Sequence, residues 1–407
     1  MERRDFLTSS LATGAAALLP SQVMSAEAVS SRAQDGRPLL TGSPVLSGPA
    51  ADSLTILQPV SGPATGFVEL SVNGEPFQRI DAESDGLLPY AAHVLKFRLP
   101  ELPAGTDVKY RVSVTPVDFQ TAYKIQRGEA VLSPTETFRT LDPAAKETRF
   151  AIWNDTHENQ ETIAGVHRLT VDFRPDFLLW NGDQTNDIYT PAKMSNQYLA
   201  PGGLAIAASW PLAYARGNHD VRGPAARHLP EFTGTPGDRF YYAFRSGPVA
   251  ALVMDTGEDK VDEHPVFGGL AAFTAMRERQ TRWLAKIIKE PFFRDAPYKL
   301  LFCHIPLFWI RESPKEGPWE SADLCRDAWL PLLKEGGIQL IVSGHTHQHR
   351  WLPAGSERPI GQLIGGGPKP PAATFTEGIA TSERLAITMR NLQGKVLHSV
   401  ELKPAQG

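Results

Sequence analysis

The sequence predicts an α/β fold in which β-sheets pack between helices, preceded by a smaller all-β segment. Up to about residue 141, strand-like runs such as His93–Leu99 and Val108–Val114 alternate in polarity with a period of two residues. After residue 146, short apolar runs typical of buried strands alternate with segments of helical spacing. A chain of 407 residues is long enough for two or three domains.

The first residues have the features of an export signal. Arg3 and Arg4 precede a weakly apolar run (residues 11–19), and residues 26–28 offer a small-residue cleavage site. This order resembles a bacterial twin-arginine signal peptide over residues 1–28; the alternative is an ordinary N-terminal helix. We therefore expect the twin-arginine export machinery as a partner and a periplasmic or extracellular location. No other stretch reaches about eighteen apolar residues, so no stable membrane span is expected.

Two segments are expected before the larger domain. Residues 29–45 are polar and contain Pro and Gly, which predicts a flexible arm. Residues 46–142 contain short strand-like runs separated by turn clusters such as Asn73-Gly74, a pattern typical of a small β-sandwich. Leu102 to Val112 resembles the end of a fibronectin-type-III-like domain.

Residues 146–405 are expected to form the larger domain. Ile163, Val166 and Leu169 have helical spacing, and an amphipathic helix is expected from Met276 to Ile288. A hairpin is expected between Arg384 and Leu402. The expected buried strands cover residues 150–154, 177–180, 211–215, 249–254, 299–303, 338–342 and 362–364.

Charge and cysteine content narrow the functional classes. The net charge of −4 and the pI of about 6.3 argue against a dedicated nucleic-acid binder, which usually carries a basic face. A small anionic substrate remains compatible, because metal ions can supply a local positive field. The two cysteines, Cys303 and Cys325, cannot build a disulfide framework. Cys303 is expected to be a small buried apolar residue, and a bridge to Cys325 is not favoured.

Polar residues with metal-binding side chains follow several of the expected strands. In open α/β sheets, ligands gather at the carboxyl ends of strands, so these side chains are expected to meet. Carboxylate, amide and imidazole donors without thiolate suit Mn, Fe or Zn. The glycine before His345 is expected to permit the tight turn that lets two imidazoles face inward. The candidates are Asp155, His157, Asp183, Asn218, His304, His345 and His347.

The order of these motifs closely resembles the calcineurin-like metallophosphoesterase superfamily, whose pattern is D-x-H, G-D, G-N-H-D/E, a lone H, and G-H-x-H. The resemblance extends over residues 145–370. It implies a binuclear enzyme that hydrolyses phosphoric esters with a metal-bridging hydroxide as nucleophile. One metal ion would be held by Asp155, His157, Asp183 and His347, and the other by Asp183, Asn218, His304 and His345. Protonated His219 would act at the leaving oxygen as the acid, with Asp220 orienting its imidazole.

Residue 186 departs from the pattern of one subgroup. Purple acid phosphatases, whose catalytic domain follows a similar β-domain, have a metal-binding tyrosine three residues after the shared aspartate. This chain has Asn186 there, three residues after Asp183. Asn186 is expected either to contact the substrate or a metal-bound water, or to cap a loop.

Three classes of function are weighed. The leading hypothesis is an exported phosphomonoesterase or phosphodiesterase, because the two share one ligand set. A catalytically inactive binding or structural module on the same fold is the alternative, and the complete ligand set argues against it. A carbohydrate-binding or adhesion protein led by residues 46–142 is not favoured, because we identify no exposed aromatic cluster in that segment.

Overall fold

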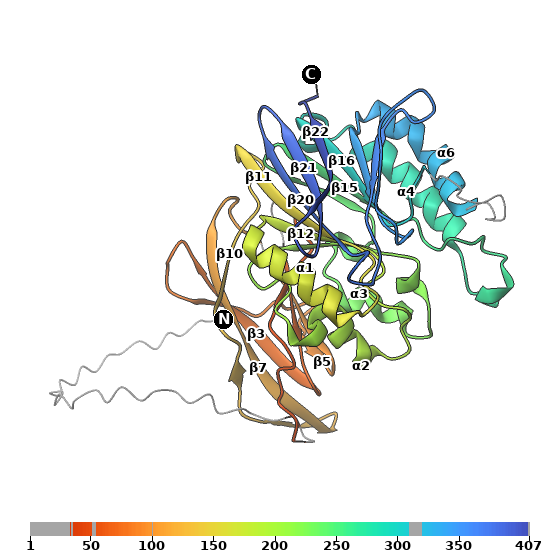
Figure 1. Cartoon of the computed structure of the whole chain (residues 1–407). Helices are drawn as coiled ribbons and strands as arrows, with labels where there is room; N and C mark the ends of the chain where they lie inside the picture. Colours follow the sequence, from red (N-terminus) through yellow and green to blue (C-terminus); the bar gives the residue numbers. More distant parts are fainter. Residues whose placement is uncertain (1–32, 34–35, 51–53, 100, 309–319, 406–407) are drawn as a thin grey trace, which may run out of the picture.

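A computed structural model describes residues 33, 36–50, 54–99, 101–308 and 320–405. The predicted signal peptide, residues 1–28, lies outside the described residues. The described strands form three sheets, of nine, seven and six strands (Figure 1). Helices of the described chain lie on the outside of the nine-stranded and six-stranded sheets (Figure 1). The predicted class, a β-sandwich flanked by helices with an all-β segment before it, is confirmed.

The nine-stranded sheet is mixed, with a parallel centre formed by β11, β12 and β13. In sheet order, its strands are β22 (Val396–Leu402), β21 (Leu385–Asn391), β20 (Thr374–Thr381), β11 (Glu147–Trp153), β12 (Phe177–Asn181), β13 (Leu212–Ala215), β1 (Val45–Ser47), β2 (Thr55–Pro59) and β6 (Val94–Arg98). The expected C-terminal hairpin is β21 and β22, and β20 pairs with β21 and β11.

The six-stranded sheet faces the nine-stranded sheet. Its strands are β14 (Tyr242–Ser246), β15 (Val249–Met254), β16 (Tyr298–Cys303), β17 (Leu340–Ser343), β19 (Gly361–Ile364) and β18 (Arg350–Leu352). β15, β16, β17 and β19 run parallel. A buried core lies between the two sheets. Within this core, the rings of Phe150 and Phe177 stack with 5.4 Å between their centroids, and Phe302 contacts Phe150 edge-on.

Helices cover the outer faces because successive strand residues point to opposite sides. On the nine-stranded sheet, Trp153 and Trp180 turn away from the inter-sheet core and pack with Val166 of α1. On the six-stranded sheet, Leu284 of α4 and Trp329 of α6 pack in the outer core. The longer helices are α1 (Gln160–Phe173), α4 (Phe273–Ile287) and α6 (Glu320–Glu335), and the short ones are α2 (Pro191–Met194), α3 (Leu229–Phe232) and α5 (Pro291–Arg294). The predicted helical patterns around Val166 and Leu284 are therefore confirmed.

The N-terminal β-sandwich shares a sheet with the larger domain. One layer is the seven-stranded sheet of β10 (Glu136–Arg139), β7 (Asp107–Thr121), β3 (Ala64–Val72) and β4 (Gln78–Ile80), with β5 (Tyr90–Ala91), β8 (Lys124–Arg127) and β9 (Val131–Leu132) pairing to β3 or β7. The other layer is β1, β2 and β6, the edge of the nine-stranded sheet. Ile56 and Phe97 face the sandwich core, whereas Leu57 and Val94 face the core of the larger domain. The sheet therefore crosses the predicted boundary between residues 46–142 and 146–405.

The described part of the predicted arm is packed, which corrects that prediction for residues 36–45. Leu39 is buried in the sandwich core, and its carbonyl accepts a hydrogen bond from Ser61 N (3.0 Å). Leu40 forms a bridge with Val60. The composition of this stretch is polar, with Pro and Gly, and by itself predicts flexibility. The packing of its apolar residues Leu39 and Leu40 outweighs that tendency.

Two smaller predictions can be compared with the described residues. Cys303 and Cys325 are both buried and free, and burial raises the pKa of each thiol. A disulfide is thus absent between these two described residues. Across the described part of the chain, no helix combines the length and the apolar character that crossing a membrane requires.

Candidate metal centre

The predicted ligands lie in loops that follow parallel strands of the two facing sheets. They are Asp155 and His157 after β11, Asp183 after β12, Asn218 after β13, His304 after β16, and His345 and His347 after β17. Backbone hydrogen bonds continue between these loops beyond the strands: His157 N donates to Asp183 O (2.9 Å), and Gly344 N donates to His304 O (2.9 Å). The loops are therefore fixed to one another as well as to their strands.

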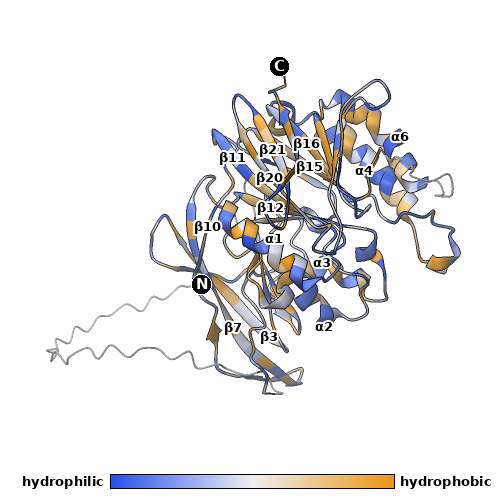
Figure 2. Cartoon of the chain, viewed as in Figure 1, coloured by the Kyte–Doolittle hydropathy of each residue, from blue (hydrophilic) through white to orange (hydrophobic). Residues whose placement is uncertain are grey.

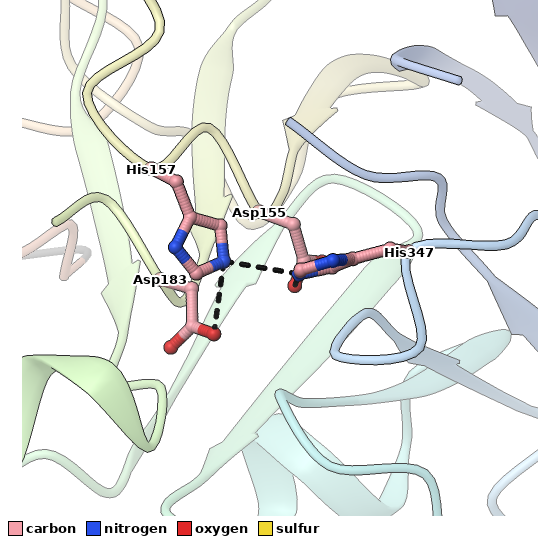
Figure 3. A group of neighbouring side chains, drawn as sticks. All are labelled: Asp155, His157, Asp183 and His347. Atoms are coloured by element: carbon pink, nitrogen blue, oxygen red, sulfur yellow. Dashed lines mark hydrogen bonds and ion pairs between the residues drawn. The ribbon is translucent and has the colours of Figure 1, made fainter. Parts of the chain in front are cut away.

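The structure brings these side chains into two groups that share Asp183. Within each group the ligand atoms lie within 4.8 Å of one another. The first group consists of Asp155, His157, Asp183 and His347 (Figure 3), and the second of Asp183, His304 and His345. Asn218 adjoins the second group, because its Oδ1 lies 2.8 Å from His345 Nδ1. The groups coincide with the two ligand sets that the family resemblance implies.

The ligand loops hold several of these residues in the left-handed backbone region. The φ angles are 48° at Asp155, 44° at His157, 54° at Asp183, 71° at His345 and 58° at His347. Such a conformation costs a non-glycine residue about 1–3 kcal/mol, although Asp and His tolerate it better than most. Strain of this kind clusters where surrounding structure forces side chains into position for function.

Two motif glycines make room for the ligand carboxylates. A Cβ on Gly344 would lie 2.2 Å from Asp155 Oδ2, and a Cβ on Gly217 would lie 2.2 Å from Asp183 Oδ1. A tight turn does begin here, since Thr346 N donates to Gly344 O (2.8 Å), but Gly344 does not have a positive φ, so the turn does not depend on the left-handed conformation that glycine allows. Gly344 is needed because the β17 loop approaches the carboxylate of Asp155 closely, which sequence alone does not reveal.

Asn186 orients two imidazoles at the centre. Its side-chain Oδ1 lies 3.1 Å from His157 Nδ1, and its backbone carbonyl lies 2.8 Å from His219 Nδ1. When His157 donates through Nδ1, its Nε2 presents a lone pair toward Asp183 Oδ2 (3.4 Å) and His347 Nε2 (3.0 Å) (Figure 3). Two ring nitrogens this close need a proton or a cation between them. Of the two predicted roles, loop contact is observed, and substrate contact stays a prediction.

His304 is held with one ring nitrogen toward the centre. Its Nδ1 lies 2.9 Å from the carbonyl of Asn181, which identifies Nδ1 as the donor. Nε2 is buried and lies 3.1 Å from Asp183 Oδ2. A proton on Nε2 or a cation beside it satisfies both groups, and a bound cation would take the place of that proton. The donor set therefore fits a metal ion on an observation independent of the motif.

Buried carboxylates give the centre a preference for positive charge. Burial raises the pKa of Asp155 to about 6. Burial acts the same way on Asp183, but the nearby His304 and His157 imidazoles hold its pKa well below the usual range. For His304, burial lowers the pKa, and Asp183 with Asp155 outweighs this and raises it to about 10. Cations placed between these groups would stabilise both carboxylates in their charged forms.

Asp220 has a different role from the one predicted. Its Oδ2 accepts hydrogen bonds from Asp183 N (3.0 Å) and Gly217 N (2.8 Å), and its Oδ1 accepts one from Tyr198 OH (2.8 Å). The imidazole of His219 is oriented by the carbonyl of Asn186 instead. The prediction that Asp220 orients His219 is therefore wrong, because both carboxylate oxygens are engaged in tying the β12 and β13 loops together.

Sequence reasoning missed Arg222, which contacts the predicted acid. Arg222 Nη1 lies 2.9 Å from His219 Nε2, and its guanidinium pairs with the buried carboxylate of Glu258. Burial lowers the pKa of His219, an effect that Asp183 opposes and Arg222 reinforces. The resting imidazole thus favours the neutral form, in contrast to the protonated form expected from sequence. The only indication in the sequence that Arg222 could contact His219 is that it lies three residues after it.

Comparison with known proteins identifies the domain that carries these loops. Residues 148–349 match the family described as calcineurin-like phosphoesterase. This part of the chain is a calcineurin-like phosphoesterase domain. The match begins at β11 and ends two residues after His347, so it contains all the predicted ligands of the phosphoesterase domain.

Curated relatives of the phosphoesterase domain carry the name serine/threonine-protein phosphatase CPPED1. The Mus musculus protein is 25% identical over 171 residues, and the Homo sapiens protein is 26% identical over 174 residues. Each match covers 42% of this chain and 48% of the relative. The chain therefore spans about half the length of the curated relatives it matches. Like the family match, these relatives are proteins to which the phosphoesterase domain is similar.

A solved structure resembles most of the chain, including the N-terminal sandwich. It is purple acid phosphatase PPD1 from yellow lupin (Lupinus luteus) seeds, with a TM-score of 0.64 at 14% identity. The alignment covers 88% of this chain and 74% of the lupin chain. At this level of identity the comparison establishes the shared fold, in which an all-β segment precedes the phosphoesterase domain.

Proposed function

We propose that this protein is a binuclear metallophosphoesterase that hydrolyses phosphoric esters. The observation that carries the proposal is the pair of ligand groups sharing Asp183, at the meeting point of strand ends from two sheets. Mixed carboxylate and imidazole donors suit Mn, Fe or Zn. When bound, such ions neutralise charge on the phosphoryl oxygens and lower the pKa of water.

The chain's own residues position the reactants. Asp183 belongs to both ligand groups, and its Oδ1 accepts a hydrogen bond from His219 N (2.9 Å), which ties the predicted acid to the centre. In the reaction, a P–O bond to water's oxygen forms as the P–O bond to the alcohol breaks. We assign to His219 the delivery of a proton to the departing alcohol oxygen. An anionic phosphate beside it would favour the protonated imidazole that this step requires.

The proposal is tested by measuring metal content and turnover on the same purified protein. We expect about two equivalents of metal after reconstitution with Mn, Fe or Zn, and hydrolysis of a chromogenic phosphate ester that chelation abolishes and metal restores. Phosphomonoesters and phosphodiesters are assayed in parallel with each metal. The competing proposal, an inactive binding or structural module, would be supported by protein that shows no turnover on either ester class with any of the three metals.

We also propose that residues 1–28 direct export by the twin-arginine route, which carries folded proteins and would allow metal loading beforehand. The support is the paired Arg3 and Arg4 before the apolar run. Changing both to Lys is expected to block accumulation of mature protein in the periplasm, as measured by fractionation and immunoblotting. Arg37→Lys, outside the signal, is the matched control. Unchanged periplasmic accumulation in the double variant would contradict this route.

A further inference from the structure

A surface pocket of about 680 Å³ adjoins the centre on the side of His219. One wall comes from the ligand loops: Tyr189 lies three residues after Asn186, and Val221 to Pro224 follow Asp220 directly. Arg222 connects pocket and centre, since it lines the pocket and also contacts His219 Nε2 at 2.9 Å. A larger hollow of about 870 Å³ lies beside α4; neither hollow is lined by a predicted ligand, but of the two only the 680 Å³ pocket is lined by Arg222.

The opposite wall is apolar and comes from the segment between β15 and α4. This segment extends from the body of the protein at the right of Figure 1, and Figure 2 shows apolar residues at its tip. Val266, Phe267, Leu270 and Phe273 line the pocket from this side. The rings of Phe267 and Phe273 meet edge to face at 6.1 Å between centroids. The wall therefore combines aromatic and aliphatic surface.

The segment is anchored at both ends. At its start, Arg277 of α4 donates to the carbonyls of Thr256 (2.8 Å) and Glu258 (2.8 Å). Near its end, the Asp262 carboxylate accepts hydrogen bonds from Phe273 N (2.8 Å) and Thr274 N (2.9 Å), at the beginning of α4. The apolar side chains between these anchors are thus held over the pocket by the fold.

Several of the apolar side chains around this hollow remain exposed. Tyr189 is 63% exposed, Val266 66% and Leu270 74%. Isolated apolar residues on a surface need no explanation, but a group of them around a concave site marks a place where ligands bind. Arg222, Arg227 and Lys260 line the same pocket, but Arg222 pairs with the lining carboxylate of Glu258 and Lys260 pairs with Asp259, so the pocket carries charges of both signs.

We propose that this pocket binds the organic group of the phosphoric ester and that the substrate class is esters of aromatic alcohols. The proposal rests on the proposed function, because the phosphoryl group is placed at the candidate metal centre. The ester oxygen would then lie beside His219 and Arg222, and the aromatic group would pack between Tyr189 and the Phe267–Phe273 pair. The aromatic lining and the continuity through Arg222 distinguish this class from small aliphatic esters.

The test compares benzyl phosphate with ethyl phosphate, whose leaving alcohols have similar acidity. Burying an aromatic ring predicts a kcat/KM that is about 10–100-fold higher for benzyl phosphate. Phe267→Ser combined with Leu270→Ser should bring this ratio close to one, because kcat/KM for benzyl phosphate falls more than kcat/KM for ethyl phosphate. The control combines Val171→Ser and Leu324→Ser, two exposed apolar residues on α1 and α6 that do not line the pocket. The control should retain the wild-type ratio.

A binding measurement separates failure of this proposal from failure of the proposed function. Calorimetry with benzylphosphonate and methylphosphonate needs no turnover, and we expect the benzyl compound to bind at least about tenfold more tightly to the wild type. The pocket variant should lose this difference. Equal binding of the two phosphonates to the wild type would overturn the pocket proposal whether or not the protein hydrolyses esters. An equal loss on both phosphate esters in the pocket variant would overturn it as well.

Discussion

Replacing Asp183 with alanine is expected to remove catalysis and lower the occupancy of both metal positions together. Its carboxylate is the member common to the two ligand groups. A metal ion supplies several kcal/mol of transition-state stabilisation, and about 1.4 kcal/mol is a tenfold change in rate, so we expect kcat to fall by at least about 10³-fold. Elemental analysis and phosphate-ester turnover, measured on one preparation under conditions without free metal, check this result.

Two further variants make the Asp183 experiment specific. Asp183→Asn keeps the shape of the side chain and an oxygen for the hydrogen bond from His219 N, but it removes the charge. It should therefore reproduce the loss of metal without a collapsed loop. Asp187→Asn, four residues along the same loop, is the matched control and should retain both metals. Loss of only one metal equivalent in Asp183→Ala would count against a shared ligand.

Replacing His219 with alanine is expected to leave the metals bound and to reduce kcat by about 10²–10⁴-fold on an ester with a poor leaving group. The loss should be smaller on a nitrophenyl ester, because its leaving oxygen needs little protonation. The structure separates the two functions: Asn218 adjoins the metal ligands, whereas the His219 imidazole is held by Asn186 and Arg222 outside both groups. Metal content and kcat on both esters check the prediction.

His228→Ala is the control, since His228 is an exposed imidazole that pairs with Glu231 away from the centre. It should leave both rates unchanged. If His219→Ala releases metal, His219 has a structural role. If both esters slow equally, His219 contributes a hydrogen bond or field at the transition state without donating a proton, which would agree with the lowered pKa of its imidazole.

The sequence by itself determined the ligand types and their placement at strand ends. Asp155, Asp183 and His304 each follow a short apolar run. A buried strand can be predicted from such a run because the signal lies within the run itself. The sequence also determined the helix around Leu284, whose spacing follows the helical repeat. It did not predict α6, which contains Pro331 inside the helix although proline is disfavoured there.

Tertiary structure decided which distant segments meet. β2 shows no polar–apolar alternation: Ile56 and Leu57 are adjacent and both buried, each in a different core, so no solvent-facing side identifies the strand's partners. The same holds at the centre. Asp220 adjoins His219 in sequence yet binds the backbone of the neighbouring loop, while Arg222 reaches His219 because Glu258, from another loop, holds its guanidinium. The hydrogen-bond partners of these side chains depend on how the loops pack in space. The order of residues along the chain does not specify that packing.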